Sequence, residues 1–378
     1  MVYKDFQGIK LSALGLGCMR LPRNSEADAD INVQLTSEMV DYAMTHGINY
    51  YDTAWGYHDG ESERVIGSLL SRYPRDSFYL ASKFPGYDLA NFGKAEEIFA
   101  AQLEKCRVDY FDFYLFHNVC ELNIDSYLDE ERYGTYSFLK RMRDEGKIRH
   151  LGCSFHGDLD VMERFMDRYG DVIEFCQLQV NWFDWKFQNA KAKVEMMKKR
   201  GVPVWIMEPL RGGRLVNLSE KERAPLRALR PEESVTAWAF RFLQTIPEVT
   251  MILSGMSNME QLSQNIAIFE RELPLSEKEW DTLLGVADGM ISSAVLPCTA
   301  CRYCTTHCPK HLDIPALIKL YDEHRFTGGG FIAPMVVGTL PEEKRPSACI
   351  GCRSCEKVCP QQIKISEVMK DFSERLKG

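Results

Sequence analysis

The feature that most restricts the fold of this chain is an alternation of short apolar runs with longer amphipathic segments. Apolar runs of a few residues indicate buried strands, and segments with apolar residues at every third or fourth position indicate helices. The eight predicted strands are 14–18, 49–52, 78–83, 111–117, 148–155, 175–180, 202–207 and 249–253. A helix is predicted after each strand, at 36–46, 61–71, 94–103, 136–145, 159–168, 189–200, 234–245 and 258–269.

Eight strand–helix units of this size predict a (β/α)8 TIM barrel. A doubly wound sheet is the alternative, but it would have a glycine-rich dinucleotide turn after an early strand. Gly15-Leu16-Gly17 lacks the third glycine and the following helix of such a turn, so the barrel is favoured. A hairpin with its turn at Gln7-Gly8 precedes the first strand and is expected to plug the bottom of the barrel. The barrel domain is predicted to span residues 1–291, with its last helix at 276–290.

Polar residues with complementary chemistry stand at or just beyond the ends of three successive strands: Asp52, Tyr57, Lys83 and His117. In a barrel, the carboxyl ends of the strands carry the catalytic groups. A lysine ammonium beside a tyrosine favours the phenolate and is expected to lower the tyrosine pKa, and a carboxylate holds the lysine in place. Each residue alone has an ordinary structural interpretation, for example Asp52 as a helix cap and His117 as a core imidazole. All four in register favour a catalytic site.

This arrangement resembles the Asp-Tyr-Lys-His tetrad of the aldo-keto reductases, through the segments Asp52-Thr53-Ala54-Trp55-Gly56-Tyr57 and Leu80-Ala81-Ser82-Lys83. The resemblance implies hydride transfer between NAD or NADP and a small carbonyl or alcohol substrate. It also implies a role for each residue of the tetrad. Tyr57 exchanges the proton, Lys83 and Asp52 adjust the pKa of Tyr57, and His117 orients the substrate oxygen.

The same resemblance implies residues that contact the cofactor. Ser154 and Gln177 match the pair that holds the nicotinamide carboxamide, while the asparagine usual after Ser154 is Phe155 here, and Met207 replaces a stacking aromatic. The alternative for Ser154 and Gln177 is that they are polar strand ends without a ligand. The cofactor candidates are Gly17, Met19, Ser154, Gln177, Met207, Leu210, Gly255, Ser257, Gln261 and Asn265.

The segment Gly255-Met256-Ser257-Asn258 opens the last barrel helix and is expected to seat a cofactor phosphate, since backbone amides at a helix start bind anions. The family places a cation for the 2′-phosphate of NADP between Gly255 and Asn265, and this chain has none there. The sequence therefore slightly favours NAD.

Eight of the 13 cysteines form two runs with the spacing C-x2-C-x2-C-x3-C-P. This spacing resembles bacterial-type ferredoxins with two [4Fe–4S] clusters, in which the fourth cysteine of each run ligates the other cluster. The resemblance implies one cluster on Cys298, Cys301, Cys304 and Cys359, and another on Cys349, Cys352, Cys355 and Cys308. Two zinc sites are the alternative. The implied second domain, a small dicluster ferredoxin-like unit, spans residues 292–378.

The connection between the two runs is longer than in a compact ferredoxin. It is predicted to contain a helix at 315–324 and an apolar, glycine-rich piece at 328–337. The apolar piece is expected to pack against the barrel, with a lid over the substrate as the alternative. The other five cysteines are predicted to be small core residues.

The net charge of −8 and the lack of a basic stripe argue against nucleic-acid binding. The first residues do not resemble a signal peptide and no apolar run has membrane-spanning length, so a cytoplasmic protein without a membrane partner is expected. Five aromatic residues in the loops are candidates either for a substrate pocket or for packing at the barrel rim: Trp55, His58, Trp182, Phe183 and Trp185.

Taken together, the sequence predicts an oxidoreductase with a nicotinamide-dependent barrel and two clusters for electron transfer, with a redox partner protein as a possible donor. Two alternatives remain open at this point. The clusters could serve only the structure of the second domain, or the barrel could be inactive in a redox carrier or sensor.

Overall fold

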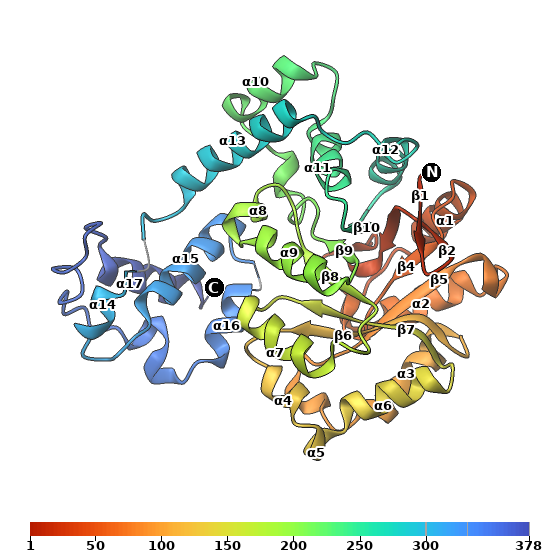
Figure 1. Cartoon of the computed structure of the whole chain (residues 1–378), viewed down its shortest axis with the longest axis horizontal. Helices are drawn as coiled ribbons and strands as arrows, with labels where there is room; N and C mark the ends of the chain where they lie inside the picture. Colours follow the sequence, from red (N-terminus) through yellow and green to blue (C-terminus); the bar gives the residue numbers. More distant parts are fainter. Residues whose placement is uncertain (299–300, 331, 378) are drawn as a thin grey trace. The chain divides into compact units, whose positions relative to one another are not determined.

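A computed structural model of the chain describes residues 1–298, 301–330 and 332–377, which form two compact units, Met1–Leu283 and Leu284–Gly378. The first unit is a closed barrel with the strand order β10-β3-β4-β5-β6-β7-β8-β9, in which all neighbours are parallel. Figure 1 shows its helices around the strands. The predicted (β/α)8 barrel is confirmed.

All eight predicted strands are present, with ends that differ from the prediction by a few residues. They are β3 Leu14–Gly17, β4 Tyr50–Asp52, β5 Tyr79–Phe84, β6 Phe111–Val119, β7 Ile148–Phe155, β8 Phe175–Gln179, β9 Val204–Met207 and β10 Val249–Gly255. Every residue of β6 is buried, which explains why Phe113–Phe116 is an apolar run rather than an alternating one. The predicted helices are α1 Val33–Thr45, α2 Ser62–Leu70, α3 Ala95–Cys106, α6 Thr135–Asp144, α7 Leu159–Tyr169, α9 Ala190–Arg200, α11 Val235–Gln244 and α12 Met259–Ile268.

The predicted hairpin consists of β1 Tyr3–Phe6 and β2 Ile9–Ser12, paired antiparallel. Its residues Phe6 and Leu11 belong to one core cluster with Phe113, Phe175 and Trp205 from inside the barrel. The Phe6 ring lies edge-on to Trp205, with 5.0 Å between ring centroids. The hairpin therefore plugs the amino-terminal end of the barrel, opposite the end that carries the site residues.

Short helices in the loops were not predicted. They include α4 Ile124–Leu128, α5 Glu130–Tyr133, α8 Asp184–Phe187 and α10 Glu220–Leu229, and several 3₁₀ turns such as η1 Cys18–Arg20 and η2 Tyr57–Gly60. Most of these segments are too short to show a helical period. The longest, α10, begins with a capping box between Ser219 and Glu222 but buries only Leu226, so its apolar stripe is weak.

The second unit contains most of α13 Glu277–Ala294, and α14 Tyr303–Thr306, α15 Ile314–Thr327, α16 Ile332–Thr339 and α17 Ile365–Arg375. The helix predicted at 315–324 corresponds to α15, whereas α17 was not predicted. The core of the second unit includes Leu317, Met369 and Phe372. From the apolar piece at 328–337, Ala333 and Val337 join this core, and Phe331 lies outside the described residues. The units divide within α13, and the boundary at residue 291 stays a prediction.

Within the described ranges, no helix combines the length and the apolar character that crossing a membrane requires.

Candidate active site and cysteine sites

The predicted catalytic residues gather at the carboxyl end of the barrel. Asp52 ends β4, Lys83 lies near the end of β5, and His117 lies in β6. The Lys83 Nζ donates to Asp52 Oδ1 at 2.6 Å, to the Thr53 carbonyl oxygen at 2.7 Å and to the Tyr57 hydroxyl at 3.3 Å. The structure thus brings Asp52, Tyr57 and Lys83 together around one ammonium group.

Lys83 and Asp52 form a buried ion pair. Burial acts to lower the pKa of Lys83, but the neighbouring Asp52 and Tyr57 outweigh it and the pKa is raised, so Lys83 stays charged. Burial raises the pKa of Asp52, and Lys83 opposes this shift. Burial also raises the pKa of Tyr57, and Lys83 offsets only part of that shift. The expected net lowering of the Tyr57 pKa is therefore wrong, although Lys83 acts in the expected sense.

His117 lies between two tyrosine rings. Its ring centroid is 6.0 Å from that of Tyr57 and 5.5 Å from that of Tyr87, and both tyrosines meet it edge-on. Burial, then the charge of Lys83, holds the pKa of His117 well below its usual range, so the imidazole is neutral. In the described part of the chain no group hydrogen-bonds to His117 Nδ1.

An open groove with a volume of about 260 Å³ lies between the segment after β9 and the start of α12. Five of the predicted cofactor residues line it: Leu210, Gly255, Ser257, Gln261 and Asn265. Ser257 is held by two hydrogen bonds, from its N–H to Gln261 Oε1 at 2.8 Å and from its Oγ to the Arg20 carbonyl oxygen at 2.8 Å.

The other five cofactor candidates lie outside the lining of this groove. Gly17 is in register with Asp52 on one side and with Gly255 on the other. Ser154 and Gln177 are in register on β7 and β8, and Ser154 Oγ accepts a hydrogen bond from a backbone N–H at 2.8 Å. Met207 ends β9 and Met19 is exposed in η1.

Arg20 is a groove residue that the sequence analysis missed. Its Nη2 lies 3.4 Å from Glu208 Oε1, and it is the cation among the described residues that line the groove. A Cβ on Gly212 would lie 3.2 Å from Arg20 Nη2, and a Cβ on Gly255 would lie 3.1 Å from Arg20 Cβ. Arg20 therefore brings a positive charge close to the segment from Gly255 to Asn265, which has no basic residue of its own. The sequence signal for Arg20 was its position in the turn after β3, the first strand of the barrel, at the end where site residues lie.

Most of the aromatic loop residues pack into the rim. Trp182 and Phe183 are fully buried, and Trp185 lies edge-on to Trp280 with 5.7 Å between ring centroids. His58 is buried, and its Nε2 accepts a hydrogen bond from the Leu21 N–H at 3.0 Å. Trp55 is partly exposed, and an ammonium group lies over its ring.

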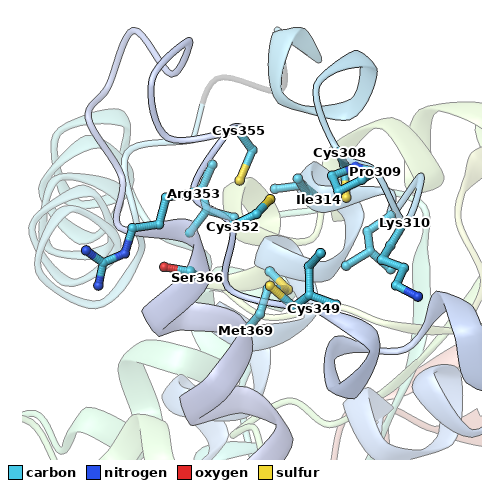
Figure 2. Close-up of a pocket in the computed structure, with 13 residues that line it drawn as sticks. Cys308, Pro309, Lys310, Ile314, Cys349, Cys352, Arg353, Cys355, Ser366 and Met369 are labelled. Atoms are coloured by element: carbon cyan, nitrogen blue, oxygen red, sulfur yellow. The ribbon is translucent and has the colours of Figure 1, made fainter.

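The second cysteine set lies around one cavity in the C-terminal unit. Cys308, from the first run, lines this cavity with Cys349, Cys352 and Cys355 from the second run. Figure 2 shows these four cysteines among apolar residues such as Met369. The residues that the sequence assigned to one cluster are therefore brought together by the fold.

The members of the first set interact electrostatically with Cys304. Burial, then the charges of Cys298, Cys301 and Cys359, raises the pKa of Cys304 to about 11. These electrostatic partners are the other three members of the predicted set. Three cysteines of the two sets, Cys304, Cys308 and Cys355, are buried, and Cys301 and Cys352 are exposed.

The donor set in both places is thiolate, which suits iron–sulfur clusters and zinc alike. Among the residues that the structure describes, no three cysteine, histidine or acidic side chains are placed as a single metal ion would require. The five remaining cysteines are all buried, as predicted: Cys18, Cys106, Cys120, Cys153 and Cys176.

These features define an oxidoreductase with an attached iron–sulfur domain: the barrel, the Asp-Tyr-Lys-His site and the cysteine-rich unit. Residues 13–288 match the model of the Aldo/keto reductase family, and residues 297–364 match that of a 4Fe-4S dicluster domain. The chain belongs to the aldo-keto reductase family and is an NAD(P)-dependent oxidoreductase of that family, with the dicluster domain at its C-terminus.

Two curated relatives illustrate the likeness. One is an NADH-specific methylglyoxal reductase of Escherichia coli, 24% identical over 68% of this chain and 90% of its own length. The other is an L-galactose dehydrogenase of Arabidopsis thaliana, 25% identical over 69% of this chain and 85% of its own length.

Solved structures show the same fold. An aldo-keto reductase of Bacillus halodurans in its holo form has a TM-score of 0.61 and 23% identity, over 76% of this chain and 96% of its own. An aldo/keto reductase of Klebsiella pneumoniae in complex with NADP and acetate has a TM-score of 0.59 and 22% identity, over 73% of this chain and 92% of its own.

Proposed function

We propose that the barrel transfers a hydride between a nicotinamide cofactor and the carbonyl or alcohol carbon of a small molecule. The observation that carries this proposal is the Tyr57 hydroxyl 3.3 Å from the buried ammonium of Lys83, which Asp52 holds at 2.6 Å. In the reductive direction Tyr57 gives its proton to the carbonyl oxygen, and in the oxidative direction it takes the proton back. Lys83 stabilises the tyrosinate that remains after proton donation.

The bound nicotinamide supplies or accepts the hydride. The residues of this chain supply position and field. His117 stays neutral, so it can hydrogen-bond the substrate oxygen without adding a second positive charge beside Lys83. The groove lined by Leu210, Gly255 and Ser257 would hold the rest of the cofactor, and Ser154 with Gln177 would hold the carboxamide.

We propose that the barrel prefers NAD to NADP, on the basis of the charges that line the groove. The segment from Gly255 to Asn265 has no cation, which favours NAD, while Arg20 is a cation nearby that already pairs with Glu208. The relatives differ, since the E. coli enzyme is called NADH-specific and the Klebsiella structure contains NADP. Fluorescence titration with NADH and NADPH should give the lower dissociation constant for NADH.

For the second unit we propose two [4Fe–4S] clusters, ligated by the two crossed sets of four cysteines, that carry electrons between a redox partner protein and the barrel reaction. The common cavity of Cys308, Cys349, Cys352 and Cys355 supports crossed ligation. The clusters supply one-electron storage when bound. A structural role has its own support, because Cys304, Cys308 and Cys355 belong to the core of the unit.

The deciding experiment is anaerobic. The protein is purified, iron and sulfide are quantified, and NADH or NADPH is added while the cluster absorbance is followed. Bleaching by the cofactor alone would show that the hydride donor and the clusters communicate. Bleaching that also requires a carbonyl substrate, and that is lost in Tyr57→Phe, would connect the clusters to the active site. Normal carbonyl reduction without bleaching would leave the clusters outside turnover. Absence of any Tyr57-dependent carbonyl reduction would overturn the barrel proposal.

A further inference from the structure

A buried polar cluster lies directly behind the catalytic lysine. Its centre is the Glu63 carboxylate on α2, which is fully buried, as are its partners Ser82 and Gln102. Ser82 Oγ donates to Glu63 Oε1 at 2.6 Å, and Gln102 Nε2 donates to the same oxygen at 2.7 Å. A fully buried carboxylate is expensive unless hydrogen bonds and a counter-charge satisfy it. A buried carboxyl group with these partners at this place calls for a functional explanation.

One arm of the cluster reaches the backbone of Lys83. Ser82 precedes Lys83 in β5, and Gln102 Nε2 also donates to the Lys83 carbonyl oxygen at 3.1 Å. Gln102 is itself fixed, because its Oε1 accepts a hydrogen bond from the Tyr114 hydroxyl at 2.5 Å. The Lys83 carbonyl group and the side chain of the preceding residue, Ser82, are therefore held from the side of Glu63. This fixes the direction in which the lysine side chain leaves the strand.

The other arm reaches the loop that carries Tyr57. Lys105 Nζ lies 3.4 Å from Glu63 Oε2 and 3.8 Å from the centroid of the Trp55 ring. Trp55 stands two residues before Tyr57. Gly60 closes this loop with a φ of +91°, and a Cβ there would lie 3.7 Å from Lys105 Nζ. Lys105 is thus packed between the carboxylate and the loop, with a cation placed over an aromatic face.

We propose that Glu63 and Lys105 form a positioning pair that sets the distance between Lys83 and Tyr57. The two oxygens of one carboxylate serve the two arms: Oε1 orients the strand of Lys83, and Oε2 holds Lys105 and, through Trp55, the loop of Tyr57. The inference rests on the proposed proton transfer by Tyr57. Neither residue of the pair contacts the reacting groups, so both act by position.

The test uses the full-length holoprotein with Lys105→Met, which keeps the side-chain length and removes the charge. Hydrogen–deuterium exchange of a peptide covering residues 53–61 reports the loop directly and needs no turnover. Exchange there should accelerate about tenfold in Lys105→Met, because the loop loses its anchor. Lys105→Arg keeps both the ion pair and the contact to Trp55 and should restore the exchange of the wild type. Lys140→Met is the matched control, since Lys140 pairs with Asp144 on an exposed helix surface.

The kinetic readout separates position from structure. In Lys105→Met, kcat for carbonyl reduction should fall about tenfold with little change in the KM for the cofactor, since a small misplacement of a reacting group has an effect of this order or more. Glu63→Gln should give a similar loss, and the double variant should lose far less than the product of the two. If Glu63→Gln does not fold, Lys105→Met, whose side chain is 11% exposed, carries the test alone.

Each outcome is informative. Unchanged exchange at 53–61 in Lys105→Met overturns the positioning pair, whether or not the protein reduces carbonyls. Faster exchange with unchanged kcat also overturns it, since the loop would then move without consequence for proton transfer. A wild type without Tyr57-dependent activity refutes the proposed function instead, and in that case the exchange data still decide whether Lys105 anchors the loop.

Discussion

The buried pair of Lys83 and Asp52 allows a prediction in which a second substitution restores stability without restoring activity. The Lys83 side chain is 0% exposed, that of Asp52 is 5% exposed, and the Nζ–Oδ1 distance is 2.6 Å. Lys83→Met removes one charge and leaves Asp52 buried without a counter-charge, which should destabilise the barrel by about 3–5 kcal/mol. Asp52→Asn/Lys83→Met removes both charges and should recover most of this loss, to within about 1–2 kcal/mol of the wild type. Both variants should be inactive, because the Tyr57 hydroxyl has lost its partner.

The assay is urea unfolding followed by tryptophan fluorescence. All six tryptophans lie in the barrel unit Met1–Leu283, so the signal reports that unit and avoids a mixed transition. Asp52→Asn alone breaks the same pair and should cost a similar amount, so the coupling energy from the double-mutant cycle should be about 4 kcal/mol or more in favour of the pair. A Lys83→Met variant within about 1 kcal/mol of the wild type would refute the reasoning. A double variant no more stable than the single one would refute it equally, because the loss would then come from packing alone.

Three further predictions follow from the same geometry. Tyr57→Phe should lower kcat for carbonyl reduction by about 10²–10⁴-fold, measured by nicotinamide absorbance, with an unchanged dissociation constant for the cofactor. Because the pKa of His117 is depressed in the folded state, the unfolded state binds the extra proton, so stability should fall as the pH drops below about 6.5. Urea midpoints at pH 7 and pH 5 should show a smaller fall in His117→Gln, and equal falls would contradict the burial argument. Cys355→Ser should reduce the iron content and unfold part of the C-terminal unit by circular dichroism, whereas exposed Cys352→Ser should lose iron with a smaller loss of helix.

Much of the barrel and its site could be predicted because their signals are local. Strands such as β6 are buried throughout and therefore stand out as apolar runs, and polar residues at their ends follow from the geometry of a parallel barrel. Asp52, Lys83 and His117 each end or nearly end such a run. The cysteine spacing is local in the same sense, and the ferredoxin resemblance that it carries groups Cys308 with the second run, whose cysteines line one cavity with it.

What could not be predicted depends on contacts between distant segments. Arg20 reaches the groove because β3 pairs with β10, which places Gly17 beside Gly255. The cluster around Glu63 joins this residue to Lys105, 42 positions away, and no sequence period links them. The net direction of the Tyr57 pKa depends on how deeply the hydroxyl is buried, and burial outweighs the neighbouring Lys83, which the sequence argument had taken as decisive.

The position of the cysteines in the second unit bears on whether the clusters are structural or carry electrons. Cys304, Cys308 and Cys355 lie in the same core as Phe372, so clusters held by them would be part of what makes this unit fold. Each proposed set also includes one exposed cysteine, which would leave an edge of each cluster accessible to a redox partner. The two roles are therefore not exclusive, and loss of activity after removal of a buried ligand cannot distinguish them. The two roles can be distinguished only by a variant that loses one cluster but keeps the other cluster and the fold. If the lost cluster is purely structural, turnover stays unchanged as long as the unit remains folded.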